Sequence, residues 1–299
     1  MTDLERMKPG TDLVTKAGTS LMPAFEQKRG APIAAPVVFA SPHSGCFYPQ
    51  DFQNDLRVPL IDLRRTEDAF IDELFGGVID QGAIQLSANY GRSYVDLNRD
   101  ARELDPEMFV DGAPLTVGMK SARVKAGLGC LPRVAASGQN ISTSKITKAE
   151  GVFRLSHVHE AYHGALSGEL EQLKNDWSDV VLIDCHSMPS KQPGRSGLPD
   201  IVLGDRFGSS CSPRLTSIVE RAFRRSGLTV SRNAPYAGGY TTRRYGRPRR
   251  GVHVLQIEIN RGLYLDEANV EKARGFISLQ NQIAEITTEI LNYALYENT

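Results

Sequence analysis

The chain has 299 residues, of which 40% are hydrophobic and 23% are charged, and its formal net charge is zero. This length is enough for one large domain or two modest ones, while the balanced charge argues against binding to nucleic acid or a membrane through the net charge of the protein. The four cysteines form no C-x-x-C pair and the first residues contain no apolar signal core. We therefore expect reduced thiols in a cytoplasmic, soluble protein.

The first elements in chain order are an arm and a strand. Residues 1–32 are polar and weakly periodic, so we expect a loosely ordered arm before a single α/β domain over residues 33–299. Residues 35–41 form an apolar run that predicts a buried strand. This strand leads directly into His43.

The next stretch predicts a helix followed by two strands. Apolar residues recur at helical spacing over 60–81, and Glu67 and Asp68 lie near the predicted start of this helix, where acidic residues favour the helix dipole. Residues 83–88 and 93–97 read as strands joined by a turn. The second of these strands leads into D-L-N-R-D.

A long irregular segment and a histidine-bearing helix come next. Residues 104–147 are rich in Gly, Pro and Ser and resist assignment. A connection of this length within a domain is usually a functional lid or a disordered insert, so we interpret it as a lid-like insertion. Residues 153–174 predict a helix that carries histidines at positions 157, 159 and 163.

Residues 180–189, V-V-L-I-D-C-H-S-M-P, are the most informative stretch. Four apolar residues predict a buried parallel strand, and the polar residues after it lie where open α/β sheets bind ligands. His186 is therefore a candidate metal ligand or acid/base, and Asp184 is close enough to orient it. A nucleophile formed by Cys185 and His186 is disfavoured, because adjacent strand residues point to opposite faces.

The last third continues the alternation of strands and helices. Residue 258 is a Glu inside an apolar strand, where a carboxylate is costly unless it is paired or functional. The alternation without a repeat favours helices on both faces of a mixed, largely parallel sheet. The predicted elements are strands over 201–204, 228–231 and 252–259, and helices over 213–226 and 266–296, the last with Asp266 as its N-cap.

Two predicted strands end in histidines that lie far apart in the sequence, His43 and His186. Two imidazoles, one carboxylate and an open position are typical of a catalytic zinc site. The third ligand would be Glu67 or Asp68, and Glu258 would be the general base that acts on water.

These residues occur within a series of motifs that resembles the N-formylglutamate amidohydrolase family, which is related to zinc carboxypeptidases and aspartoacylases. The likeness runs from about residue 37 to 265 and includes S-P-H-S-G, E-D-A-F-I-D-E-L-F, G-R-S-Y-V-D-L-N-R-D, D-C-H-S-M-P-S, G-G-Y-T and Q-I-E-I-N-R-G-L-Y-L-D. The resemblance implies a phosphorylase/hydrolase-like three-layer α/β/α sandwich and a bound divalent metal, with zinc preferred.

The resemblance also assigns roles to single residues. Cys46 stands where zinc carboxypeptidases carry a glutamate ligand, so Asp68 is preferred as the acidic ligand and Glu67 is the alternative. A guanidinium matches a carboxylate bidentately, which suits Arg99 for substrate binding. The implied roles are metal ligands His43, Asp68 and His186, general base Glu258, and substrate contacts Asn98, Arg99, Arg92, Arg133 and Tyr240, while His163 is either a further contact or a packed residue.

The implied reaction is hydrolysis of N-formyl-L-glutamate to formate and L-glutamate, a late step in histidine breakdown. A carboxypeptidase-like enzyme or another deacylase of N-acyl amino acids is the alternative, and the closure provided by residues 104–147 would distinguish them. A third possibility, an anion- or nucleic-acid-binding module, depends on residues 221–250, which contain nine arginines and no acid. The sequence makes no prediction of oligomeric state.

Overall fold

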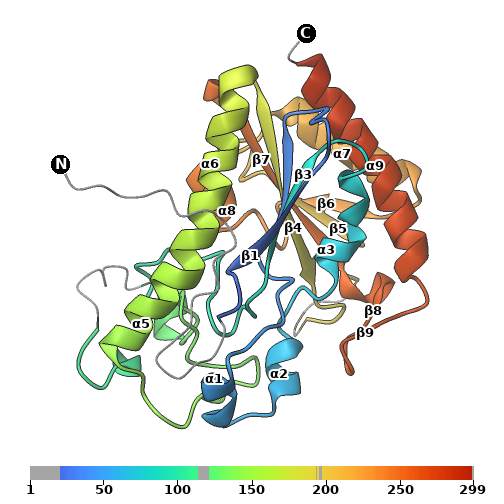
Figure 1. The fold of residues 1–299 in the computed structure, drawn as a ribbon. Coiled ribbons are helices and arrows are strands. Elements are labelled where there is room, and N and C mark those ends of the chain that lie inside the picture. The colour runs from blue at the N-terminus through green and yellow to red at the C-terminus, as the bar shows by residue number, and fades with distance from the viewer. Residues whose placement is uncertain (1–20, 114–120, 193, 195–196, 298–299) are drawn as a thin grey trace, which may run out of the picture.

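A seven-stranded mixed sheet organises the computed structural model, which describes residues 21–113, 121–192, 194 and 197–297 (Figure 1). The strand order is β1-β3-β2-β4-β7-β5-β6, with β1 and β3, and β5 and β7, antiparallel and the other neighbours parallel. The strands are β1 Phe25–Arg29, β2 Val37–Ser41, β3 Ile84–Ala88, β4 Val180–Met188, β5 Ile201–Gly204, β6 Val230–Arg232 and β7 Val252–Asn260.

Helices flank both faces of this sheet, so the predicted α/β architecture is confirmed (Figure 1). No described helix is long and apolar enough to cross a membrane. The helices are α1 Gln50–Asn54, α2 Leu60–Arg64, α3 Ile71–Leu74, α4 Ala122–Lys125, α5 Lys148–Arg154, α6 Ala161–Asp176, α7 Pro213–Arg225, α8 Tyr240–Tyr245 and α9 Phe276–Tyr296.

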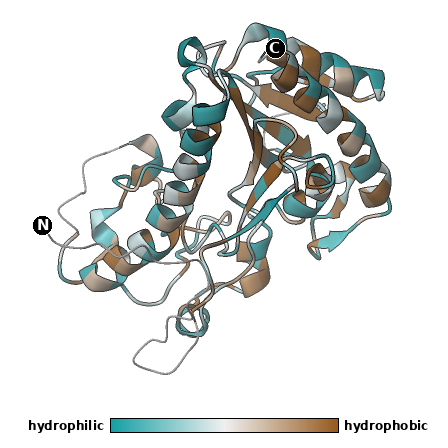
Figure 2. Ribbon diagram, turned by 45° about the horizontal axis from the view of Figure 1, so that its top comes forward, coloured by the Kyte–Doolittle hydropathy of each residue, from teal (hydrophilic) through white to brown (hydrophobic). Residues whose placement is uncertain are grey.

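Alternating strand residues build a separate core on each face. In β2, Val37 and Phe39 pack in the core that α3, α7 and α9 complete, whereas Val38 and Ala40 pack in the core that α6 completes. This alternation follows from the period of two in a strand. Figure 2 shows hydrophobic residues concentrated along the central strands between the two layers of helices. The sheet is thus covered on both faces, which leaves its strand ends as the place for a site.

The predicted helix over residues 60–81 is wrong as a continuous element. Helix α2 ends at Arg64 and α3 begins only at Ile71. Between them the Asp68 backbone N–H donates to the His43 carbonyl at 2.9 Å, and Phe70 has a positive φ of 62°. The helix is interrupted because this turn directs Asp68 toward His43.

The predicted strand over residues 93–97 is also wrong. The Tyr94 N–H bonds to the Gly91 carbonyl at 2.9 Å, and the Asp96 N–H bonds to the Cys130 carbonyl at 2.7 Å. These bonds form a turn and connect it to the irregular segment. The backbone groups are therefore satisfied without pairing to a neighbouring strand. Asp266 likewise caps no helix, because it lies in the short strand β8 Leu265–Asp266 and α9 begins at Phe276.

Two expected boundaries differ from the structure. The expectation of a loose arm over residues 1–32 is wrong for residues 25–29, which form edge strand β1, while residues 1–20 lie outside the described part of the chain. Strand β4 continues to Met188, so Asp184 and His186 lie within the strand and not beyond it. The predicted strands over 35–41, 83–88, 201–204 and 252–259 and the helix over 213–226 are confirmed within one or two residues.

Candidate metal centre and active site

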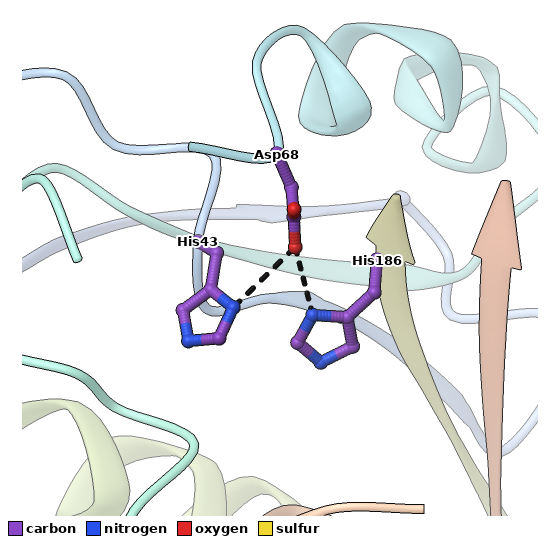
Figure 3. A group of neighbouring side chains, drawn as sticks. All are labelled: His43, Asp68 and His186. Carbon is purple, nitrogen blue, oxygen red and sulfur yellow. Dashed lines mark hydrogen bonds and ion pairs between the residues drawn. The ribbon is translucent and has the colours of Figure 1, made fainter. Parts of the chain in front are cut away.

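Two histidines and one aspartate converge at the carboxyl ends of β2 and β4. His43 follows β2, His186 lies in the adjacent parallel strand β4, and Asp68 comes from the turn between α2 and α3 (Figure 3). Asp68 Oδ2 lies 2.9 Å from His186 Nδ1 and 3.4 Å from His43 Nδ1. One ligand atom from each residue lies within 4.8 Å of the other two, and all three residues are buried. The predicted metal-binding trio is therefore brought together.

Polar side chains lie beside the opposite nitrogens of the two imidazoles. Asp96 is hydrogen-bonded to His43, whereas His186 Nε2 is hydrogen-bonded with Asn98 Nδ2 at 3.1 Å and has the Asp184 carboxylate close by without a hydrogen bond. His43 Nε2 lies 2.8 Å from Asp96 Oδ1, and His186 Nε2 lies 3.0 Å from Asp184 Oδ1. Carboxylates in this position fix the orientation of metal-ligating histidines and raise their basicity. Both Nδ1 atoms consequently face Asp68.

The chemistry of this cluster fits a divalent cation. His43 Nδ1 is buried and has no hydrogen-bond partner in the described structure. Buried polar atoms nearly always have a partner, so this nitrogen is available to a metal. Burial alone would raise the pKa of Asp68, but the hydrogen bond with His186 and the proximity of both imidazoles outweigh it and hold that pKa well below its usual range. A charged carboxylate with two imidazole nitrogens is a donor set that zinc favours.

Glu258 lies beside the cluster on the neighbouring strand. In the parallel pairing of β4 and β7, Glu258 is directly opposite His186. Its Oε1 accepts a hydrogen bond from Gln256 Nε2 at 2.7 Å. Burial raises the pKa of Glu258 to about 8, against the opposing effect of His186. A carboxyl group of this kind can accept and return a proton near neutral pH.

A cavity of about 670 Å³ opens over these residues and is lined by both histidines, Asp68 and Glu258. Its walls also carry five arginines, at positions 65, 92, 99, 123 and 261. The cavity is the size of a small-molecule site, and guanidinium groups favour an anionic occupant.

The comparisons with known proteins agree with this geometry. A family model described as N-formylglutamate amidohydrolase matches residues 35–265. The chain belongs to this family. It is therefore a hydrolase, and the resemblance of its motifs is confirmed.

Named members of the N-formylglutamate amidohydrolase family are similar over most of the chain. N-formylglutamate deformylases of Pseudomonas putida and Pseudomonas aeruginosa are each 29% identical, with 78% and 80% of this chain and 82% and 85% of those proteins covered. The crystal structure of N-formylglutamate amidohydrolase from Ralstonia eutropha JMP134 matches with 33% identity and a TM-score of 0.87, covering 92% of this chain and 100% of that one. A second structure, from Agrobacterium tumefaciens, shares the fold at 20% identity and a TM-score of 0.58, with 95% of this chain and 98% of that one covered.

Three of the predicted substrate contacts line the cavity of this amidohydrolase. Arg92 donates to Asp96 Oδ2 at 3.0 Å. Asn98 Oδ1 accepts from the Thr241 N–H at 2.9 Å, which leaves its Nδ2 near His186. Arg99 Nη1 bonds to the Asn98 carbonyl, while its Nε is buried without a hydrogen-bond partner among the described residues.

Asn98 also explains the glycines that precede α8. A Cβ atom on Gly239 would lie 2.4 Å from Asn98 Nδ2. Only a glycine permits this approach, so the Gly238-Gly239 turn lets α8 pack against the amide.

Four other predicted residues are placed away from the cavity lining. Arg133 donates to Asp105 at 2.6 Å and borders a separate hollow. The Tyr240 hydroxyl accepts from Arg244 at 2.6 Å, and His163 lies between the Tyr245 hydroxyl and the Leu97 carbonyl. Glu67 accepts from the Tyr48 hydroxyl at 2.8 Å, so Asp68 alone of the acidic pair reaches the histidines.

Sequence reasoning missed several residues at the centre. Arg261 Nη2 donates to Asp68 Oδ1 at 3.0 Å, and Gln256 bonds to Glu258. Gln256 could have been found from its position two residues before Glu258, on the same face of β7. Arg123 comes from the irregular segment, where no periodic signal identified it.

Proposed function

We propose that this protein is a metal-dependent deformylase that hydrolyses N-formyl-L-glutamate to formate and L-glutamate. The observation that carries the proposal is the trio His43, Asp68 and His186 beside Glu258 in a cavity with arginine walls. The names of the similar Pseudomonas and Ralstonia proteins support the same substrate.

His43, Asp68 and His186 would hold the cation, for which zinc is the proposed identity because the ligand set contains two imidazoles and one carboxylate. When bound, the cation supplies Lewis-acid polarisation of the amide carbonyl and makes a nearby water molecule more acidic. Arg261 and Ser187 hold Asp68 Oδ1 at 3.0 and 3.2 Å, which leaves Oδ2 directed at the histidines.

Glu258 would carry the proton in the reaction. Its carboxylate removes a proton from the attacking water and returns it to the departing amide nitrogen. The hydrogen bond from Gln256 occupies Oε1 and fixes the carboxylate, so Oε2 remains for the proton.

Arg99, Asn98 and Arg92 would bind and orient the substrate. The buried Nε of Arg99 lacks a partner that a carboxylate oxygen would supply. Arg92 has a partner in Asp96, so its second role is to keep that aspartate on His43.

The proposed setting is histidine breakdown in the cytoplasm. All four cysteines are free, which agrees with a reducing compartment. Of the arginines in residues 221–250, Arg224 and Arg232 pair with Glu220, and Arg225 pairs with Glu289. These three of the nine arginines are thus engaged within the protein and are not reserved for a polyanion.

The test is Glu258→Gln, which removes the proton carrier and keeps the shape of the side chain. We expect formate release from N-formyl-L-glutamate to fall by about 10²–10⁴-fold, with the metal content unchanged by elemental analysis. Glu271→Gln, at an exposed position in β9 Glu271–Lys272, is the matched control and should keep full activity. Normal turnover by Glu258→Gln would remove this residue from the proton-transfer role.

A further inference from the structure

The five arginines of the cavity differ in how their charges are balanced. Three of them have carboxylate partners within the protein. Arg65 lies 2.8 Å from Asp62, Arg92 lies 3.0 Å from Asp96, and Arg261 lies 3.0 Å from Asp68. These three guanidinium groups are neutralised without a ligand.

Arg99 and Arg123 have no carboxylate partner in the described part of the chain. Arg99 makes one hydrogen bond, to the carbonyl of its neighbour Asn98, and its Nε is buried and unpaired. Arg123 lies exposed on α4 and forms no ion pair with any described residue. Repulsion from Arg99 is the largest influence on Arg123 and lowers its pKa. Two cations that form no ion pair with a described carboxylate therefore face one cavity, and Glu103 and Asp96 attract Arg123 only from beyond ion-pair distance.

The two arginines differ in exposure, because Arg99 is half-buried and Arg123 is exposed. Arg99 follows Asn98, whose Nδ2 is 3.1 Å from His186 Nε2. Arg123 belongs to α4, in the irregular segment that also contributes Leu128 and Pro132 to the cavity lining. An N-acyl dicarboxylic amino acid has the matching pattern, because its α-carboxylate is next to the scissile amide and its side-chain carboxylate is further away.

We propose that Arg123 is the specificity-determining residue that binds the side-chain carboxylate of the substrate, while Arg99 binds the α-carboxylate. This assignment rests on the proposed function. It explains why the enzyme would prefer a substrate whose side chain is acidic. A neutral substrate of the same shape leaves Arg123 uncompensated and loses the charge-assisted hydrogen bond.

The experiment compares two substrates that differ only in this charge, N-formyl-L-glutamate and N-formyl-L-glutamine. In the zinc-loaded wild-type enzyme, kcat/KM should favour the glutamate compound by about 10–100-fold, because a hydrogen bond to a charged group is at stake. In Arg123→Met this preference should disappear, through loss on the glutamate compound and little change on the glutamine compound. Arg123→Lys keeps the charge and should retain part of the preference.

Lys125→Met is the matched control, since Lys125 is exposed on the same short helix but does not line the cavity. It should keep the wild-type preference, and all variants should unfold at the wild-type temperature. An equal loss on both substrates in Arg123→Met, or an unchanged preference, overturns the role of Arg123 alone. Absence of formate release from the wild-type enzyme with both substrates overturns the proposed function, and the specificity assignment with it.

Discussion

At the scale of single residues, each candidate metal ligand is oriented by a neighbouring side chain. That neighbour bonds to a different atom from the one that would bind the metal. Asp96 is hydrogen-bonded to His43 Nε2 and Asn98 to His186 Nε2, while Arg261 and Ser187 bind one oxygen of Asp68. The ligand atoms are thereby oriented before a cation arrives. Preorganisation of this kind lowers the entropy lost on binding.

Asp96→Asn tests this support. Asparagine keeps the size of the side chain but removes the charge behind His43 Nε2, so metal affinity should fall by about 10–100-fold. Competition with a fluorescent chelator measures it directly. Asp100→Asn is the control, because Asp100 pairs with Arg102 and not with a histidine. Wild-type affinity in Asp96→Asn would show that the carboxylate does not tune the site.

The residues that could be predicted share one property, which is a polar side chain within or directly after an apolar run. His43, His186 and Glu258 stand out in this way, because only function or pairing offsets the cost of burying them. The choice of Asp68 over Glu67 came from the family resemblance, and the structure gives its reason in the turn at residues 65–70. Arg123 and Arg133 both lie in the segment 104–147, which has no hydrophobic periodicity. The sequence around them therefore did not distinguish Arg123, which lines the cavity, from Arg133, which does not.

At the scale of elements, the helical stretch from Lys148 to Asp176 holds the loop that carries Asn98. This stretch consists of α5, a π-helical turn over Leu155–Glu160 and α6. From it, His159 Nε2 lies 2.9 Å from the Arg99 carbonyl and His163 Nε2 lies 2.8 Å from the Leu97 carbonyl. The two histidines thus fix the backbone on either side of Asn98.

His163 also makes stability depend on pH. Burial, together with nearby His159 and Arg244, lowers its pKa well below the usual value against the opposing hydrogen bond to the Leu97 carbonyl, so His163 is neutral in the fold. The unfolded chain binds a proton near pH 6.5, so this group's contribution to the free energy of unfolding is present above about pH 6.5 and is lost as the pH falls. The loss is at most about 1.4 kcal/mol per pH unit.

The prediction is that His163→Gln is less stable than wild type at pH 7.5 but loses less of its free energy of unfolding between pH 7.5 and pH 5.5. Urea unfolding at both pH values measures the difference. The same loss in both proteins would mean that His163 does not titrate on unfolding.

Element boundaries show where local pattern is insufficient. The apolar spacing over residues 60–81 is genuine, since Leu63, Leu74 and Val78 are all buried. The helix is nevertheless broken, because the contact between Asp68 and His43 is a tertiary interaction that sequence spacing does not reveal. The same applies to residues 93–97, whose backbone is tied to residue 130.

At the scale of the whole molecule, the candidate metal site joins parts of the chain that are distant in sequence. Its ligands come from residues 43, 68 and 186, which meet only when β2, β4 and the turn after α2 are assembled. The unfolded chain has no equivalent site, so a bound metal stabilises the native state by mass action.

Removal and return of the metal should therefore shift thermal unfolding. With free zinc at about 100 times its dissociation constant, the native state gains about 2.7 kcal/mol, which for a chain of this size raises the unfolding temperature by roughly 4 °C. Scanning fluorimetry of chelator-treated protein with and without zinc measures the shift. Asp68→Asn should abolish it, and a shift that persists in this variant would locate the stabilising metal elsewhere.

The layered architecture was predictable because strands and helices alternate along most of the chain. The edge of the sheet was not. Strand β1 is exposed at four of its five residues, so it shows no apolar pattern, and it forms only by antiparallel pairing with β3. An element stabilised by its neighbour in this way leaves little trace in its own composition.

The matched positions of His186 and Glu258 in β4 and β7 have a consequence for redesign. Their separation is determined by the backbone ladder of two central strands, whereas Arg123 belongs to a peripheral helix of four residues. In the proposed mechanism, the proton carrier and the residue that selects the acyl amino acid therefore belong to separate elements of the protein. Exchanging the segment that carries Arg123, Leu128 and Pro132 between related enzymes should transfer substrate preference. The spacing of His186 and Glu258 should remain unchanged.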